Sequence, residues 1–409
     1  MRIVLSFLLL LGFMSQDVLA GWNGAALDFQ RRYDFEVGDG YLSTVWGSCH
    51  SPNPSWNKMV TKVTNWNVVS DDLFYRTLPT KMALLRDDRG RVKKAPVIFF
   101  IPGAFTNLDE KMPKHFVDRF TRLGYHTFVV PNPWGTQYVS RKPRTITGHI
   151  EAEANVLYGV FKRAHEYLVS KGYTNGEFHI AGVSYGAFLS AMISGIAASD
   201  PERTLSFKST TIISPPLNLG ESLNNLDSVL DETVDYTSMW FPRLAKKYLS
   251  ICRVDVDDVG KYSKKDAMGL AASQGFHVNL INSLRLYDKL WDLDSIPGNF
   301  WGKLSRKYRS WRKSMSFSRY FRVYNKAAGK LADGPKGEIT YWIEMARENS
   351  DTNIQVLMAQ DDFLNSNRAK GLIESKLLSD ELIELPTGGH FGFRALPWFD
   401  HFLEKAFKP

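Results

Sequence analysis

Apolar runs alternate with amphipathic segments over much of the first half of the chain. The run at 95–101 is apolar throughout, as expected of a strand buried on both faces of a parallel sheet. Further strands are predicted at 78–85, 125–130, 178–183 and 210–214, and helices at 112–123, 149–171 and 188–197. This succession predicts an α/β fold with a mostly parallel sheet, right-handed crossovers and flanking helices.

The rhythm breaks at 217–345, where helical patterns dominate, with predicted helices at 242–251, 265–272, 278–290 and 301–313. The sheet resumes with strands at 354–359 and 381–385 and helices at 368–378 and 398–407. We therefore expect a sheet domain formed by 91–216 and 346–409, with 217–345 inserted as a helical cap. Residues 21–90 are predicted to hold an N-terminal extension and the first strands. Within them, 21–70 either packs on the domain or adds an edge strand.

One stretch places a serine between a strand and a helix in a glycine-rich turn, Gly182-Val183-Ser184-Tyr185-Gly186. This is the context of a nucleophile elbow, in which the serine is strained and the glycines let strand and helix cross closely. The Tyr185 amide would lie at a helix N-terminus, where it can donate to a developing oxyanion. The alternative is a Ser/Gly turn without chemistry.

A serine hydroxyl needs a base, and the base needs an orienting carboxylate. Of nine histidines, His390 directly follows a predicted strand in a Gly-Gly loop, and it is the predicted base. Asp361 and Asp362 follow the strand at 354–359, and spacing from the strand end favours Asp362 as the acid over Asp361. A solvated turn is the structural alternative there. Remoter acid candidates are Glu221 and Asp227.

A second oxyanion donor is expected from the loop after the strand at 95–101, where Gly103 lets backbone approach substrate and the amide of Ala104 or Phe105 would donate. The predicted reaction is acyl transfer. Ser184 attacks an ester carbonyl, His390 takes its proton, and water later releases the acid.

These motifs resemble the α/β-hydrolase superfamily, and within it most of all the serine-aminopeptidase-like and YheT-like branches. The resemblance covers about 95–215 and 350–409, and it implies the fold, a Ser-Asp-His triad in that chain order, and hydrolase activity without a cofactor. Pro102 departs from the pattern, because many members have His before the glycine. Residues 21–70 and 217–345 lie outside this resemblance, so it implies no substrate. The stretches that carry the resemblance are Phe100-Ile101-Pro102-Gly103, Gly182 to Gly186, Asp361-Asp362-Phe363-Leu364 and Gly388-Gly389-His390-Phe391-Gly392-Phe393.

The first twenty residues have the pattern of a secretory signal peptide. Arg2 precedes an apolar run from Ile3 to Met14, and small residues before Gly21 predict cleavage after Ala20. Export to a periplasm or out of the cell is therefore predicted, with an uncleaved anchor as the alternative.

The two cysteines, Cys49 and Cys252, could form a disulfide in an exported chain, and the sequence leaves pairing open. His50 beside Cys49 could suggest a metal ligand, but a histidine in a loop is the preferred interpretation, and no metal site is predicted.

The formal net charge of +8 over 409 residues is mild, and nucleic acid is not expected as a partner. Residues 301–330, however, carry ten Lys or Arg and no acidic residue, interleaved with aromatic side chains. This segment is predicted either to meet an anionic membrane surface or acidic substrate, or to be a solvated cap helix with aromatic residues facing the core.

The sequence therefore predicts an exported serine hydrolase that cleaves carboxylic esters, of small molecules or lipids, through an acyl-enzyme on Ser184. Alternatives are a serine peptidase, since the same triad cleaves amides, and a catalytically silent hydrolase fold that serves as an envelope binding protein. Acyl chain length and oligomeric state are not indicated.

Overall fold

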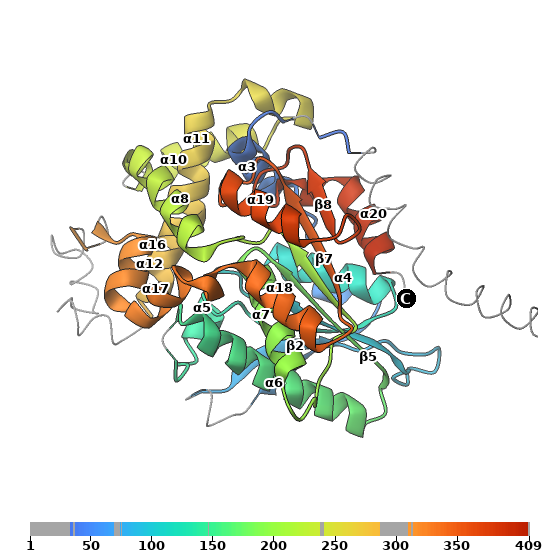
Figure 1. Ribbon diagram of the computed structural model, residues 1–409. Coiled ribbons are helices and arrows are strands. Elements are labelled where there is room, and N and C mark those ends of the chain that lie inside the picture. Colours follow the sequence, from blue (N-terminus) through green and yellow to red (C-terminus); the bar gives the residue numbers. More distant parts are fainter. Residues whose placement is uncertain are drawn as a thin grey trace, which may run out of the picture.

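An eight-stranded sheet forms the centre of the structure (Figure 1). The structure, a computed structural model, describes residues 33–35, 37–68, 74, 76–145, 147–237, 241–286, 310–311 and 314–407. The predicted signal peptide lies outside these residues and stays a prediction, as does most of the helix predicted at 301–313.

The strand order is β1-β2-β4-β3-β5-β6-β7-β8. The pairs β1–β2 and β2–β4 are antiparallel, and every other pair in the sheet is parallel. The fold class predicted from the sequence is thereby confirmed. The strands are β1 (Val63–Val68), β2 (Leu78–Ala83), β3 (Ala95–Ile101), β4 (His126–Val129), β5 (Thr174–Val183), β6 (Ser209–Ile213), β7 (Asn353–Ala359) and β8 (Leu382–Leu385).

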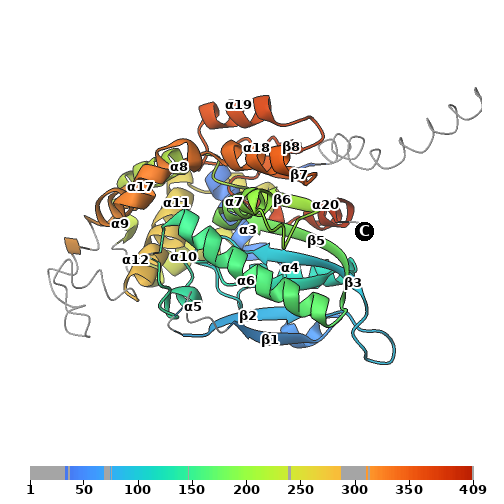
Figure 2. The same cartoon turned by 60° about the horizontal axis from the view of Figure 1, so that its bottom comes forward.

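The sheet separates two hydrophobic clusters because neighbouring side chains of a strand point to opposite faces. Val97 and Phe99 of β3 belong to one cluster, and Ile98 and Phe100 belong to the other. Helices α6 (Ile150–Ser170), α7 (Tyr185–Ser199), α18 (Ile339–Asn349) and α19 (Asn367–Lys376) contribute to the first cluster. Helices α3 (Gly40–His50), α4 (Lys111–Arg122) and α20 (Pro397–Ala406) contribute to the second. Figure 2 shows α6 running along one face of the sheet.

The N-terminal segment contributes both a helix and an edge strand. Both alternatives left open for residues 21–70 occur, because β1 is an edge strand and α3 packs on the domain. The helix α3 packs against the opposite end of the chain, as described below, and its position was not predicted.

The described helices between residues 219 and 332 gather to one side of the sheet (Figure 1). The helices predicted at 265–272 and 278–290 meet in one continuous helical stretch that runs from Lys264 to Leu284 with a π-helical middle. Residues 287–290 of the second prediction lie outside the described residues. Gly269 opens the π-helical part, where a Cβ would overlap the ring of Tyr236. None of the helices within the described ranges is long and apolar enough to cross a membrane.

The domain boundaries stay a prediction. The remaining helices are α5 (Thr136–Val139), α8 (Leu219–Glu232), α9 (Val234–Thr237), α10 (Phe241–Ile251), α11 (Lys264–Met268), α12 (Val278–Leu284), α16 (Phe317–Arg319) and α17 (Lys326–Ala332). The π-helical segments are η3 (Gly269–His277) and η4 (Tyr320–Tyr324), and the 3-10 turns are η1 (Trp56–Lys58), η2 (Val256–Lys261), η5 (Pro335–Gly337) and η6 (Gly392–Ala395).

Candidate active site

Ser184 stands at the tip of a strained turn between β5 and α7. Its φ of 56° and ψ of −126° lie where an L-residue is rarely found. Two glycines make room for the turn. A Cβ on Gly182 would overlap the backbone oxygen of Gly186, and a Cβ on Gly186 would overlap backbone oxygens at the end of β3. The structure therefore has the strand, turn and helix that a nucleophile elbow requires.

The predicted nucleophile, base and acid are joined by two hydrogen bonds. His390 Nε2 lies 2.7 Å from Ser184 Oγ, and His390 Nδ1 lies 2.9 Å from Asp362 Oδ2. Asp362 is 1% exposed and the other two residues are each 7% exposed, so water competes little for these bonds. A carboxylate on Nδ1 leaves Nε2 free to accept the hydroxyl proton. The arrangement can thus activate Ser184 and stabilise the imidazolium that forms.

The adjacent carboxylates Asp361 and Asp362 have different partners. Asp362 Oδ1 accepts from the Leu364 amide at 3.0 Å, which leaves Oδ2 for the histidine. Asp361 Oδ1 accepts from the Gly389 amide at 2.7 Å, so this side chain braces the loop that carries His390. Burial raises the pKa of Asp361, and hydrogen bonds from loop amides oppose that rise. These contacts favour Asp362 over Asp361 as the partner of the base.

The loop after β3 lies against the serine. A Cβ on Gly103 would be 3.3 Å from Ser184 Cβ, and Ala104 and Tyr185 line the pocket onto which Ser184 opens. Neither the Ala104 amide nor the Tyr185 amide donates to another described residue. Tyr185 is also the first residue of α7, where the helix dipole favours negative charge. The two residues whose amides are the predicted oxyanion donors thus line the same pocket as Ser184.

A buried asparagine fixes this loop at the position where the sequence departs from its resemblance. Asn132 Nδ2 donates to the Pro102 carbonyl at 2.8 Å, and Asn132 Oδ1 accepts from the Trp134 amide at 2.9 Å. Phe105, whose amide is the alternative oxyanion donor, has a left-handed backbone conformation with a φ of 66°. Sequence reasoning missed Asn132, which directly follows Pro131 after β4 and carries no recognisable motif.

The loop that carries His390 rests on α3. Thr44 Oγ1 accepts from the His390 amide at 2.8 Å. Glycines allow the close contact, because a Cβ on Gly47 would overlap the backbone of η6 and a Cβ on Gly389 would overlap the Gly40 oxygen. Sequence reasoning missed this support. The available signal was the spacing of Gly40, Thr44 and Gly47, which puts small residues at i, i+4 and i+7 on one helix face.

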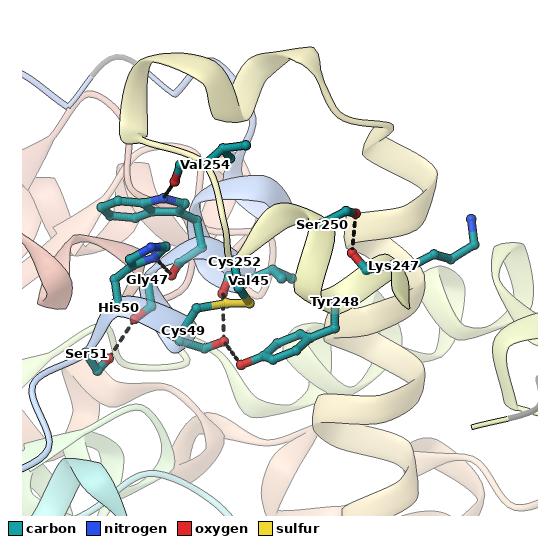
Figure 3. Close-up of a disulfide and its surroundings, with 12 residues drawn as sticks. Val45, Gly47, Cys49, His50, Ser51, Lys247, Tyr248, Ser250, Cys252 and Val254 are labelled. Atoms are coloured by element: carbon teal, nitrogen blue, oxygen red, sulfur yellow. Dashed lines mark hydrogen bonds between the residues drawn. A yellow bond between two sulfur atoms is a disulfide. The ribbon is translucent and has the colours of Figure 1, made fainter. Parts of the chain in front are cut away.

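A disulfide between Cys49 and Cys252 ties α3 to the residue that follows α10 (Figure 3). The pairing that the sequence left open is therefore made, across 203 residues of chain and with Cα atoms 5.5 Å apart. Beside it, Trp46 Nε1 donates to the Val254 carbonyl at 3.1 Å. The bridge and this bond hold the helix on which the His390 loop rests.

A carboxylate is fully buried behind the elbow. Glu153 accepts from the Tyr185 hydroxyl and from the Gly148 amide, each at 2.5 Å. Burial raises the pKa of Glu153 to about 7, although both hydrogen bonds oppose the rise. Burial and this neighbouring carboxylate also raise the pKa of Tyr185 well above its usual range. Because the Tyr185 amide is a predicted oxyanion donor, Glu153 holds the side chain of a residue in the site.

An apolar pocket of about 70 Å³ opens at Ser184. By its volume it has room for several water molecules or a short chain. Within the described part of the chain, no charged side chain lines this pocket. Such a surface favours an apolar group bound beside the serine. The lining includes Trp134, Leu219, Leu223, Leu226, Phe276, Phe317, Phe321 and Leu364.

Other histidines have structural partners. His126 Nδ1 accepts from the Leu85 amide at 2.9 Å, and His179 Nδ1 lies 2.7 Å from Ser209 Oγ. Burial lowers the pKa of His126, and it lowers that of His179 to about 4. Three further histidines lie in helical segments: His50 in α3, His115 in α4 and His277 in η3.

The described part of 301–330 turns its aromatic residues inward. Trp311, Phe317, Tyr320 and Phe321 are all buried. The amide of Phe317 donates at 2.8 Å to Asp227, one of the remoter acid candidates. The other, Glu221, accepts from Arg368 Nε at 2.6 Å. Residues 301–309 lie outside the described ranges, and a membrane role for the segment stays a prediction.

No family model matches the chain, and no curated protein matches its sequence. Solved structures match it at low identity. A fungal esterase from Rhizomucor miehei is 13% identical, with 95% of each chain covered and a TM-score of 0.45. Brefeldin A esterase, described as a bacterial homologue of human hormone-sensitive lipase, is 12% identical over 90% of this chain and 82% of that chain, with a TM-score of 0.45. A hyperthermophilic esterase from the archaeon Pyrobaculum calidifontis is 13% identical over 94% of this chain and 96% of that chain, with a TM-score of 0.43.

Sequence identities and TM-scores this low assign neither a family nor an activity. They do not support the serine-aminopeptidase-like or YheT-like branch in particular. The fold stands on the chain's own topology. The strand order, the antiparallel β2 and the elbow between β5 and α7 identify the protein as having the α/β-hydrolase fold.

Proposed function

We propose that this protein is a serine hydrolase that cleaves carboxylic esters through an acyl-enzyme on Ser184. The proposal rests on one observation above all. The hydrogen-bonded line from Ser184 through His390 to Asp362 ends at an apolar pocket. A serine with this base and acid is the arrangement that activates a hydroxyl for acyl transfer.

In the proposed reaction, Ser184 Oγ attacks the ester carbonyl and passes its proton to His390 Nε2. The oxyanion that forms accepts hydrogen bonds from the amides of Ala104 and Tyr185. The intermediate then expels the alcohol, which takes the proton from His390. A water molecule then passes a proton to His390 and attacks the acyl-enzyme. The second intermediate releases the carboxylic acid as Ser184 Oγ takes that proton back, and Asp362 stabilises the imidazolium in both halves.

The pocket favours an ester with an apolar acyl group over the substrate of an aminopeptidase. A free α-ammonium group needs a carboxylate partner when it leaves water. The described lining of the pocket offers none. We therefore place esters of apolar acids first, and peptides with a free amino terminus second.

Fluorophosphonate labelling with mass mapping tests the proposal. A single adduct on Ser184 is expected, and Ser184→Ala should abolish both labelling and hydrolysis of acyl esters. Ser222→Ala is the matched control, because Ser222 lines the same pocket and its hydroxyl has no partner among the described residues. That variant should still be labelled on Ser184. A well-folded protein without an adduct would instead support the silent binding protein.

Export is also part of the proposal. It is supported by the leader-like first twenty residues and by the disulfide, since such bonds persist in oxidising compartments. The mature protein should begin at Gly21, and intact mass of the native protein would reveal a retained leader. We further propose that 301–330 meets anionic membranes. Equal cosedimentation with phosphatidylserine and phosphatidylcholine vesicles would contradict that part.

A further inference from the structure

A second cavity, of about 380 Å³, lies beside the loop that carries His390. It is formed by the end of α3, the start of α4 and the turn η6, and it shares no lining residue with the pocket at Ser184. Its volume falls in the range of small-molecule sites. Its character differs from that of the apolar pocket, because cationic side chains are prominent in its lining.

The first cation is Arg394, which is partly buried in η6. Its Nε donates to the Gly47 carbonyl at 3.3 Å, and its guanidinium lies 5.3 Å from the centre of the Phe391 ring. Among the described residues, no carboxylate forms an ion pair with it. Loss of water lowers its pKa to about 10. A guanidinium held by one carbonyl and one aromatic ring keeps donors available for a ligand.

The second cation is Lys111, in the first turn of α4. Its Nζ donates to the Cys49 carbonyl at 2.9 Å, a neutral partner. Partial burial lowers the pKa of Lys111, and repulsion from Arg394 lowers it further. Lys114 lines the same cavity one turn along. Lys111 and Arg394 therefore repel one another across a shared space, and an anion placed there would relieve that repulsion.

Two carboxylates, Asp109 and Glu110, also line the cavity, but within the described ranges neither forms an ion pair with Arg394, Lys111 or Lys114. Glu110 accepts from the amide and side chain of Asn107, both at 2.9 Å. Asp109 accepts from Trp56 Nε1 at 3.0 Å, and it lies 3.5 Å from the Nζ of Lys81. His115 is engaged by Asp400 at 3.0 Å.

The N-terminus of α4 is not counted among the sources of positive potential. Its first turn has no acidic residue, but its N-cap residue is Glu110, whose carboxyl group opposes the partial positive charge of the helix end. The case for an anion site therefore rests on Arg394 and the two lysines.

We propose that this cavity binds the oxyanion group of a small ligand, a phosphate or a sulfate. Arg394 would supply a forked pair of donors, and Lys111 and Lys114 would supply flexible ones. Two sources share this chemistry, a free anion and a phosphate carried by the substrate itself.

Inorganic phosphate is the first probe, added to the purified mature protein at constant ionic strength with chloride as the reference. Calorimetry should show saturable binding, and the thermal midpoint should rise with phosphate more than with chloride. Arg394→Gln should weaken phosphate binding by about tenfold or more, because it removes charge-assisted hydrogen bonds. Lys111→Met should weaken it as well, and it serves in place of the first variant if that one fails to fold.

Arg91→Gln, on a distant hairpin where Arg91 pairs with Asp87, is the matched control and should bind phosphate like the parent protein. An equal response to phosphate and chloride in the parent protein would overturn the proposal. So would an equal phosphate affinity in the parent protein, Arg394→Gln and Lys111→Met.

Steady-state kinetics distinguishes the two sources of the bound anion. The kinetic experiment depends on the proposed esterase activity, whereas the phosphate-binding measurement does not depend on it. If the group belongs to the substrate, a phosphate-bearing acyl ester should have a lower KM than its neutral counterpart, and Arg394→Gln should remove the difference. If the anion is free, the two esters should behave alike while phosphate still binds. A protein that binds phosphate but hydrolyses no ester would refute the proposed function and leave this site standing.

Discussion

Glu153→Gln measures what the buried carboxylate behind the elbow does to stability. Burial raises the pKa of Glu153 from an ordinary 4.5 to about 7. Between these values the folded protein keeps a proton that the unfolded chain has lost. The free energy of unfolding therefore falls as pH rises through this window. Above pH 7 it stays at the lower value. At about 1.4 kcal/mol per pH unit, the loss amounts to about 3 kcal/mol.

Glutamine removes the titration but preserves the contacts. Its carbonyl can still accept from the Gly148 amide, and its amide can donate to the Tyr185 hydroxyl oxygen. Relative to the parent protein, the variant should therefore gain about 3 kcal/mol between pH 4.5 and pH 8. Groups that titrate in both proteins cancel in this difference.

The assay is denaturant unfolding of both proteins at several pH values in that range. Glu151→Gln is the matched control, because Glu151 lies in the same helical turn, pairs with Lys336 and is partly exposed. It should show a much smaller pH-dependent difference. A stability difference between the parent protein and Glu153→Gln that is the same at pH 5 and pH 8 would refute the reasoning.

Three further predictions concern the His390 loop and its support. Asp362→Asn should lower kcat by roughly 10⁴-fold because the histidine loses its orienting partner, whereas Asp361→Asn should keep most activity; the reverse order in steady-state kinetics would exchange their roles. Replacing Cys49 and Cys252 by serine should lower the free energy of unfolding by up to about 5 kcal/mol, and an unchanged denaturation midpoint would argue against the bridge. Gly47→Ala should push α3 away from the loop that carries His390, because the added Cβ would overlap the backbone of Gly392. Fluorophosphonate labelling should fall by a larger fraction than the circular dichroism signal. A fully labelled variant would show that the contact between α3 and this loop is dispensable.

Much of the sheet was predictable because its signals are local. β3 coincides with the predicted strand at 95–101, since a strand buried on both faces must be apolar along its whole length. The elbow was predictable for a similar reason, because its strand, glycines and helix are contiguous. The meeting of Ser184 with His390 followed from the rule that parallel strands end at one edge.

The helix α3 was not predictable, because its sequence has little helical preference of its own. Glycine, serine, threonine and valine make up much of it, and its first turn contains no acidic residue. An Asp39 cap, the disulfide and packing against the His390 loop stabilise it, and of these three only the cap is local. Likewise, the π-helical segment that begins at Gly269 depends on contact with Tyr236, which periodicity cannot show.

The contact between Thr44 and His390 also fixes when the site can form during biosynthesis. It joins residues 346 positions apart, so the loop settles only after the last part of the chain has emerged and returned to the first. Contacts of such long range form late in folding. A nascent chain thus carries a complete elbow with no base beside it. In the exported hydrolase proposed above, the nucleophile would stay unactivated until both ends of the chain have docked.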